Sequence, residues 1–122
     1  MRSALVVDDD ADTVHLISTM LREEGIPTTG LQHPLRVFDA VKALRPAVVV
    51  LDVVMPVLDG WDELRLLGLD AATRHVPVIL LSAWPGALVA PGGNGTPEAF
   101  ATLVKPFAIE ELLGLVHAAF AA

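Results

Sequence analysis

The chain has 122 residues, enough to bury a substantial core, and we expect residues 1–122 to form a single domain. It contains no cysteine, which excludes disulfides, thiolate catalysis and cysteine-ligated zinc sites and fits a cytoplasmic protein. A net charge of −7 with only two lysines disfavours direct nucleic-acid binding, because phosphate contacts need a basic face. The apolar runs are too short to span a bilayer and no signal peptide is evident, so no membrane association is expected.

The first half of the chain alternates strand-like and helical patterns. Strands are predicted at 4–7, at 27–31 and at 47–51, where a β-branched apolar run ends at Asp52. An acidic cluster follows the first strand, and Asp10 or Asp12 is expected to cap a helix that stops at Gly25. A second helix is predicted to open at Pro34 and to end before Pro46.

The second half continues this alternation with one interruption. After a turn at Asp59-Gly60, a helix is predicted over 61–69, and a strand follows at 77–81. A fifth strand is expected at 102–104 and a final helix at 108–121, whose apolar face carries Ile109, Leu112, Leu113, Val116 and Phe120. The intervening 85–97 segment is rich in proline and glycine, so we expect a loop with short helical turns at 87–90 and at 97–101.

Strands that alternate with helices predict an α/β fold with a parallel sheet and helices on both faces. Five units in a chain of this length favour a flavodoxin-like, doubly wound, five-stranded sheet with strand order 2-1-3-4-5. The fourth helix is expected to be short, irregular or missing, because it falls on the 85–97 segment.

Polar side chains follow four of the predicted strands. Because the carboxyl ends of parallel strands share one edge of a sheet, we expect these side chains to meet, and they are Asp8, Asp9, Asp52, Ser82 and Lys105. Three neighbouring carboxylates repel one another, and a hard divalent cation such as Mg²⁺ relieves that repulsion. With a lysine and a hydroxyl beside it, Asp52 is suited to carry a phosphoryl group.

Four motifs in this order resemble the receiver domain of two-component response regulators, and the resemblance covers essentially the whole chain. They are VVDDD at 6–10, LDVVMPVLDGWD at 51–62, ILLSA at 79–83 and VKPF at 104–107.

The resemblance implies a role for each site residue. Asp52 matches the phosphoacceptor, Ser82 the switch hydroxyl and Lys105 the phosphate-pairing lysine. Asp8, Asp9, Asp52 and the backbone carbonyl of Val54 match the ligands of Mg²⁺, for which Mn²⁺ is an alternative. Pro106 matches a cis-peptide position that orients the lysine.

Two features depart from the family pattern. The family usually has an aromatic residue where this chain has Thr102, and a fourth helix where it has the 85–97 segment. Val54 and Trp84 occupy the two positions that tune phosphoryl lifetime in the family. An apolar Val54 cannot orient an attacking water, so slow self-dephosphorylation is expected. Trp84 is interpreted either as a cover for the core or as a lid beside the site.

The leading hypothesis is a phosphoaccepting switch rather than an enzyme. Its expected partners are a sensor histidine kinase or a histidine phosphotransfer protein, and a downstream effector protein or domain. The Ala-rich outer side of the final helix is a candidate homodimer contact. One alternative is a degenerate receiver that acts as a phosphorylation-independent interaction module, and another is a small phosphatase with Asp52 as nucleophile.

Overall fold

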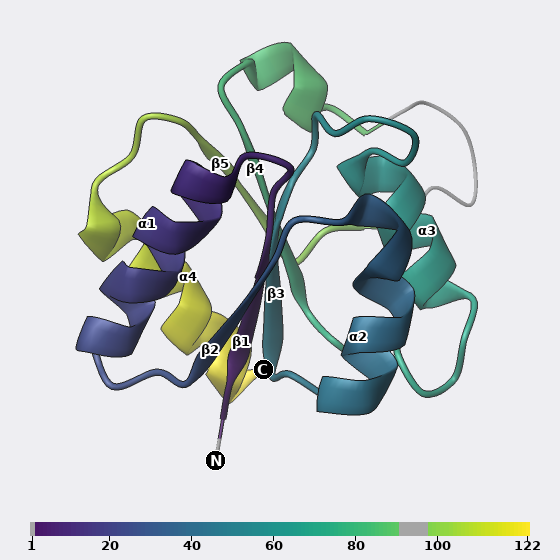
Figure 1. The fold of residues 1–122 in the computed structure, drawn as a ribbon, viewed down its shortest axis with the longest axis horizontal. Coiled ribbons are helices and arrows are strands. Elements are labelled where there is room, and N and C mark those ends of the chain that lie inside the picture. Colours follow the sequence, from purple (N-terminus) through teal and green to yellow (C-terminus); the bar gives the residue numbers. More distant parts are fainter. Residues whose placement is uncertain (1, 91–97) are drawn as a thin grey trace.

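The computed structural model describes residues 2–90 and 98–122 and confirms the predicted sheet. Five parallel strands run in the order β2-β1-β3-β4-β5. They are β1 (Ala4–Val7), β2 (Thr28–Leu31), β3 (Val48–Asp52), β4 (Val78–Ser82) and β5 (Ala101–Val104). The α-helices are α1 (Ala11–Glu23), α2 (Val37–Leu44), α3 (Gly60–Gly68) and α4 (Ile109–Ala121). Figure 1 shows α1 and α4 on one face of the sheet and α2 and α3 on the other.

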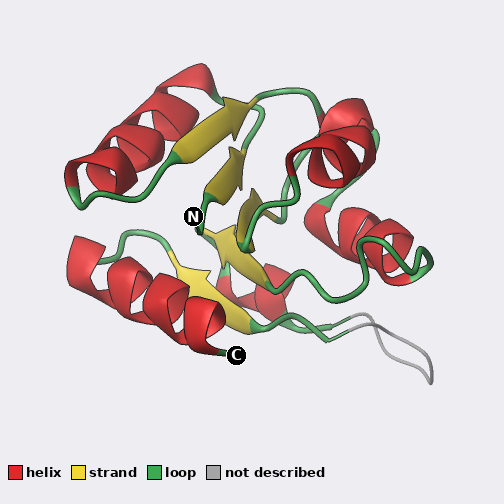
Figure 2. Ribbon diagram, turned by 90° about the horizontal axis from the view of Figure 1, so that it is seen from below, coloured by secondary structure: helices red, strands yellow, loops and turns green. Residues whose placement is uncertain are grey.

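The core consists of two apolar layers, one on each face of the sheet (Figure 2). Every residue of β1, β3 and β4 is buried, which is why these strands read as continuous apolar runs instead of alternating patterns. One layer joins the sheet to α1 and α4, where Leu112 and Val116 are fully buried as the spacing predicts. The other layer joins it to α2 and α3.

Side-chain caps fix the starts of two helices. Asp10 caps α1, since its carboxylate accepts hydrogen bonds from the backbone and side chain of Thr13. Asp59 caps α3 in a reciprocal capping box with Asp62. The Asp59-Gly60 pair predicted as a turn is therefore the first turn of α3, which begins and ends one residue earlier than expected. A 3₁₀ turn, η1 (Pro34–Arg36), precedes α2.

The connection between β4 and β5 differs in detail from the prediction. Its described part holds one 3₁₀ turn, η2 (Pro85–Leu88), instead of a turn at 87–90. The difference arises because Pro85 takes the first helical position, where its missing N–H costs nothing. The predicted turn at 97–101 is wrong for 98–101, since the Phe100 N–H pairs with the Val78 carbonyl at 2.8 Å and β5 begins at Ala101. The rest of the 85–97 prediction, residues 91–97, lies outside the described residues.

The outer strand β5 has one covered and one open face. Ala101 and Leu103 pack against the layer of α1 and α4, whereas Thr102 and Val104 are exposed on the opposite face. Phe100 lies beside the amino end of β4, away from Ser82, so it does not stand in for an aromatic residue at position 102.

None of the helices in the described ranges is long and apolar enough to cross a bilayer.

Candidate functional site

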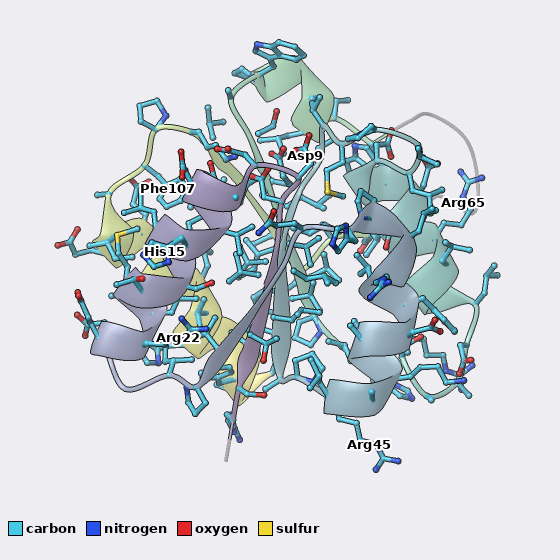
Figure 3. All side chains as sticks on the ribbon, viewed as in Figure 1. Asp9, His15, Arg22, Arg45, Arg65 and Phe107 are labelled. Atoms are coloured by element: carbon cyan, nitrogen blue, oxygen red, sulfur yellow. The ribbon has the colours of Figure 1, made fainter. Side chains whose placement is uncertain are left out.

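The carboxyl edge of the sheet brings together all five predicted side chains. Asp8 follows β1 directly, Asp52 and Ser82 end β3 and β4, and Lys105 follows β5. With Asp9, which follows Asp8, they line a cavity of about 270 Å³, whose other lining residues are Asp10, Thr13, Val54, Ala83 and Trp84. Figure 3 shows Asp9 at this edge of the sheet, above the ends of the central strands.

Lys105 lies between two of the carboxylates. Its Nζ atom is 3.1 Å from Asp8 Oδ2 and 3.4 Å from Asp52 Oδ1. Burial opposes the charged form of Lys105, but the hydrogen bond to Asp8 and the attraction of Asp52 outweigh it and raise the lysine pKa. The ammonium group is thus held as a fixed positive charge beside Asp52. The Lys105–Pro106 peptide bond is cis, as the resemblance implies.

The carboxylates of Asp8, Asp9 and Asp52 form a close acidic cluster. One oxygen from each of Asp8, Asp9 and Asp52 lies within 4.8 Å of the other two. Burial, and then the charge of Asp8, raise the pKa of Asp52 to about 6. Burial, and then a side-chain hydrogen bond with Asp8, raise the pKa of Asp9. Hard oxygen donors at this spacing, with one side open to the cavity, fit a magnesium ion that keeps several waters.

Ser82 and its neighbour Trp84 line the same cavity as the three carboxylates. Ser82 is buried, and its Oγ accepts a hydrogen bond from the Trp84 backbone N–H at 3.0 Å. The Trp84 side chain is 65% exposed, so it lines the cavity and does not cover the core. Val54 is half exposed on the same cavity and offers no side-chain hydrogen bond to a water there.

Gly60 allows α3 to start directly beneath the acidic site. Its N–H donates to the Val53 carbonyl at 2.8 Å. A Cβ at this position would lie 2.9 Å from Val53 Cα, closer than real Cβ atoms approach, and 3.0 Å from the Asp52 carbonyl oxygen. The missing side chain thus lets the start of α3 fix the backbone that carries Asp52.

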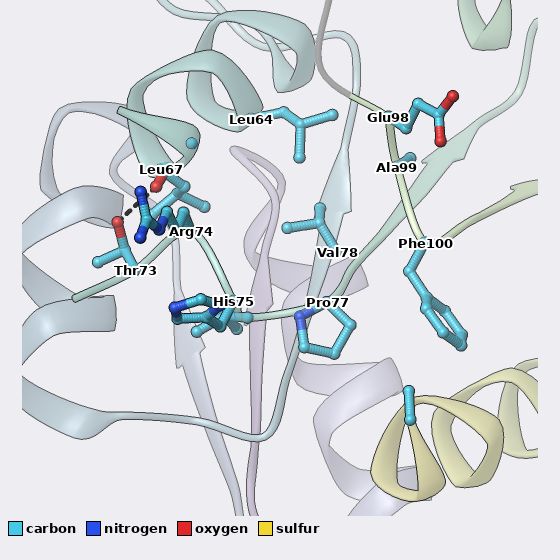
Figure 4. A pocket seen from close by; sticks show the side chains of 13 residues that line it. Leu64, Leu67, Thr73, Arg74, His75, Pro77, Val78, Glu98, Ala99 and Phe100 are labelled. Carbon is cyan, nitrogen blue, oxygen red and sulfur yellow. Dashed lines mark hydrogen bonds between the residues drawn. The ribbon is translucent and has the colours of Figure 1, made fainter. Parts of the chain in front are cut away.

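A larger cavity of about 610 Å³ lies elsewhere, near the amino end of β4 (Figure 4). Its walls include Leu64 and Leu67 of α3, Val78 and Phe100, with Arg74, His75 and Glu98 around it. The carboxylate cluster found among the described residues lies at the cavity of about 270 Å³ and not at this larger one. The four histidines are exposed and none joins that cluster.

A family model described as the response regulator receiver domain matches residues 4–117. The chain belongs to the response regulator receiver family. This receiver domain is 34% identical over 115 residues to the DNA-binding response regulator MtrA of Mycolicibacterium paratuberculosis, covering 93% of the chain and 49% of MtrA. It is 39% identical over 83 residues to the response regulator PleD of Caulobacter vibrioides, covering 67% of the chain and 18% of PleD. The chain thus spans half or less of the length of these relatives.

Solved structures agree with this assignment. The receiver domain of the sensor histidine kinase PA1611 from Pseudomonas aeruginosa superimposes with a TM-score of 0.84 at 25% identity, covering 99% of this chain and 98% of that one. That structure holds a magnesium ion in its active-site cleft. The receiver domain of the Francisella response regulator 1452 gives a TM-score of 0.81 at 29% identity, with coverages of 99% and 98%.

Two features of this receiver domain escape prediction from sequence. Thr13 lines the acidic cavity, although the sequence marks it only as an early residue of α1. Trp61 donates its indole N–H to the Ala87 carbonyl at 2.9 Å, which ties α3 to η2. The Asp-x-x-Asp spacing at 59–62 is a sequence signal for the capping box that positions Trp61. Its partner on η2 has no such signal.

Proposed function

We propose that this receiver domain accepts a phosphoryl group on Asp52 from a phosphohistidine, in a reaction that depends on Mg²⁺. The donor would be a sensor histidine kinase or a histidine phosphotransfer protein. The observation that carries the proposal is the position of the Lys105 ammonium, within 3.4 Å of Asp52 Oδ1 and 3.1 Å of Asp8 Oδ2. A purely structural ion pair needs one carboxylate, whereas this lysine contacts two, Asp8 and Asp52.

The chain's own residues account for most of the chemistry. A carboxylate oxygen of Asp52 attacks phosphorus, and the P–N bond of the protonated phosphohistidine breaks with its electron pair returning to the imidazole nitrogen. An aspartyl phosphate and a neutral histidine result. Lys105 holds one phosphoryl oxygen by charge, and the Ser82 hydroxyl is suited to donate to another. Trp84 and Val54 border the open side, from which the donor approaches.

Asp8, Asp9 and Asp52, with the Val54 carbonyl, are the residues that would hold the metal. The carboxylate oxygens are hard donors within 4.8 Å of one another, which fits Mg²⁺ and accommodates Mn²⁺. When bound, the ion supplies positive charge against the phosphoryl oxygens and relieves the repulsion between the carboxylates.

The proposed role is that of a switch with self-phosphorylation and self-dephosphorylation chemistry, without turnover of a metabolite. The output is a change in contacts with a downstream effector, either a separate protein or another part of a longer chain. The exposed outer face of β5 and the small outer residues of α4 are the described surfaces available for such contacts or for a homodimer.

The test is incubation with Mg²⁺ and acetyl phosphate or phosphoramidate, followed by intact mass measurement. We expect a gain of one phosphoryl group that is lost in Asp52→Asn and retained in Asp12→Asn, which changes an exposed acid outside the cluster. No gain from any donor, with the protein folded, contradicts the proposal and favours a phosphorylation-independent interaction module. Sustained hydrolysis of a phosphoester through Asp52 contradicts it in favour of a phosphatase.

A further inference from the structure

A continuous path of hydrogen bonds leads from the site to the surface of α3. The Ser82 Oγ accepts from the Trp84 backbone N–H at 3.0 Å. The Trp84 carbonyl accepts from the Ala87 N–H at 3.0 Å, which closes η2. The Ala87 carbonyl accepts from the Trp61 indole N–H at 2.9 Å. Three bonds therefore connect the switch hydroxyl to one side chain on a different element.

We propose that Trp61 is a positioning residue that holds η2, and through Trp84 the Ser82 hydroxyl, in the unphosphorylated arrangement. The proposal rests on the function proposed above, since it concerns how phosphorylation of Asp52 is sensed. It assigns the readout to α3 and η2, in a chain that has Thr102 where the family's inward-moving ring stands.

Hydrogen bonds at the start of α3 hold the backbone of Trp61 in place. Its helix begins at the Asp59 cap and is bonded through the Gly60 N–H to the Val53 carbonyl, next to the phosphoacceptor. The half-buried Trp61 ring packs against the same apolar layer as Ala87 and Leu88 of η2. An indole N–H can only donate, so the Ala87 carbonyl is a directional partner for it.

The turn η2 is less buried than β4, the strand that precedes it. It packs beside β4 and β5, and its residues are half-buried or exposed. If the Ser82 side chain rotates to donate to a phosphoryl group on Asp52, its oxygen moves away from the Trp84 N–H, which then loses its acceptor. A part-buried N–H left without an acceptor is unfavourable, so the turn shifts until that group is paired again. The shift moves the Ala87 carbonyl away from the Trp61 indole.

Thermodynamic reciprocity predicts whether loss of the Trp61–Ala87 bond raises or lowers the affinity for a phosphoryl analogue. If binding of a phosphoryl analogue weakens the Trp61–Ala87 bond, removal of that bond must strengthen analogue binding by the same factor. A single hydrogen bond makes a modest net contribution, so the expected factor is about two- to tenfold. A side chain that only stabilised the fold would leave the affinity unchanged.

The experiment is a double-mutant cycle with beryllofluoride and Mg²⁺ as the phosphoryl analogue. Dissociation constants are measured for the unsubstituted chain, Trp61→Phe, Ser82→Ala and the double variant. Phenylalanine keeps the ring and removes the donor. We expect Trp61→Phe to tighten binding two- to tenfold in the presence of Ser82, and by less than about twofold in its absence. Equal affinities with and without the indole, or equal changes in both backgrounds, would overturn the proposal.

A second measurement needs no variant. The chain has two tryptophans, so its indole N–H groups give two resolvable resonances. Saturation with the analogue is expected to accelerate solvent exchange of the Trp61 indole proton, and an unchanged exchange rate would contradict the coupling. If the unsubstituted chain does not bind the analogue at all, the proposed function itself fails. Binding without any effect on Trp61 overturns this inference alone.

Discussion

At the scale of single residues, Glu63 is the buried carboxyl that the acidic site leaves unexplained. It lies on α3 with 1% of its surface exposed, and neither carboxyl oxygen has a hydrogen-bond partner among the described residues. Burial, and then the charge of Asp62, raise its pKa to about 7. A carboxyl whose pKa is higher in the folded than in the unfolded chain is protonated preferentially in the folded state.

Protonation of Glu63 makes the free energy of unfolding depend on pH. Between the ordinary value of 4.5 and about 7, the folded chain binds more protons at Glu63 than the unfolded chain. The free energy of unfolding therefore falls as pH rises through this window, by on the order of 1–3 kcal/mol. Glu63→Gln should remove this contribution and be more stable than the unsubstituted chain above the window. Urea unfolding at several pH values measures it, with the exposed Glu23→Gln as control. Parallel profiles for all three proteins contradict the assignment.

Val54 is expected to set the lifetime of the aspartyl phosphate that the proposed function places on Asp52. Its apolar side chain borders the cavity and cannot hold a water in line with a phosphoryl group on Asp52. The aspartyl phosphate should therefore be long-lived, and Val54→Asn should shorten its lifetime several-fold by orienting a water.

The lifetime of the aspartyl phosphate is measured as the decay of the phosphorylated mass after the donor is removed. Val57→Asn is the matched control, because Val57 lies in the same loop outside this cavity and its φ of 71° suits asparagine. Loss of the label within seconds from the unsubstituted chain is the outcome that contradicts this account.

At the scale of elements, the start of α3 fixes the backbone beside Asp52, the proposed phosphoacceptor. Gly60→Ala would place a Cβ 2.9 Å from Val53 Cα, which is backbone and cannot turn aside. We expect a loss of about 1–3 kcal/mol in the free energy of unfolding, together with slower phosphorylation of Asp52.

Gly68→Ala is the matched control on the same helix. It has no atom within 4 Å of the added Cβ, so it should be neutral or stabilise the chain by up to about 1 kcal/mol. Denaturant unfolding of the two variants measures the difference. Equal stabilities would show that the contact at Gly60 is easily relieved.

The strands and the residues at their ends could be predicted from the sequence, whereas contacts that depend on tertiary packing could not. Runs such as Ala47–Leu51 predict their strands because burial on both faces leaves little choice of residue. From those strand ends, the shared edge predicts that Asp52 and Lys105 meet. The Asp59-Gly60 pair predicts a turn because this pair is common in turns, but it also starts helices, and here the capping box of Asp59 with Asp62 starts α3. The burial of Glu63 and the Trp61–Ala87 bond depend on tertiary packing, which leaves no mark in local spacing.

At the scale of the whole molecule, an acidic chain concentrates three carboxylates at one edge of its sheet. Mg²⁺ that binds only the folded chain should raise the free energy of unfolding, by about 2.7 kcal/mol at one hundred times its dissociation constant. Thermal unfolding with and without Mg²⁺, at matched ionic strength, measures this effect. Asp9→Asn should largely abolish it, whereas Asp12→Asn, on an exposed position outside the cluster, should preserve it. Equal stabilisation of both variants would mean that Mg²⁺ acts only as general salt.

At the carboxyl edge of the sheet, Asp52 is the residue that we propose to be the phosphoacceptor. The most direct measurement is reductive trapping of the phosphorylated chain with borohydride, which converts an aspartyl phosphate to homoserine, followed by peptide sequencing. The account predicts homoserine at position 52 alone, dependent on Mg²⁺. Homoserine at Asp8 or Asp9, or a phosphoryl group that resists reduction because it is not on a carboxylate, would contradict it.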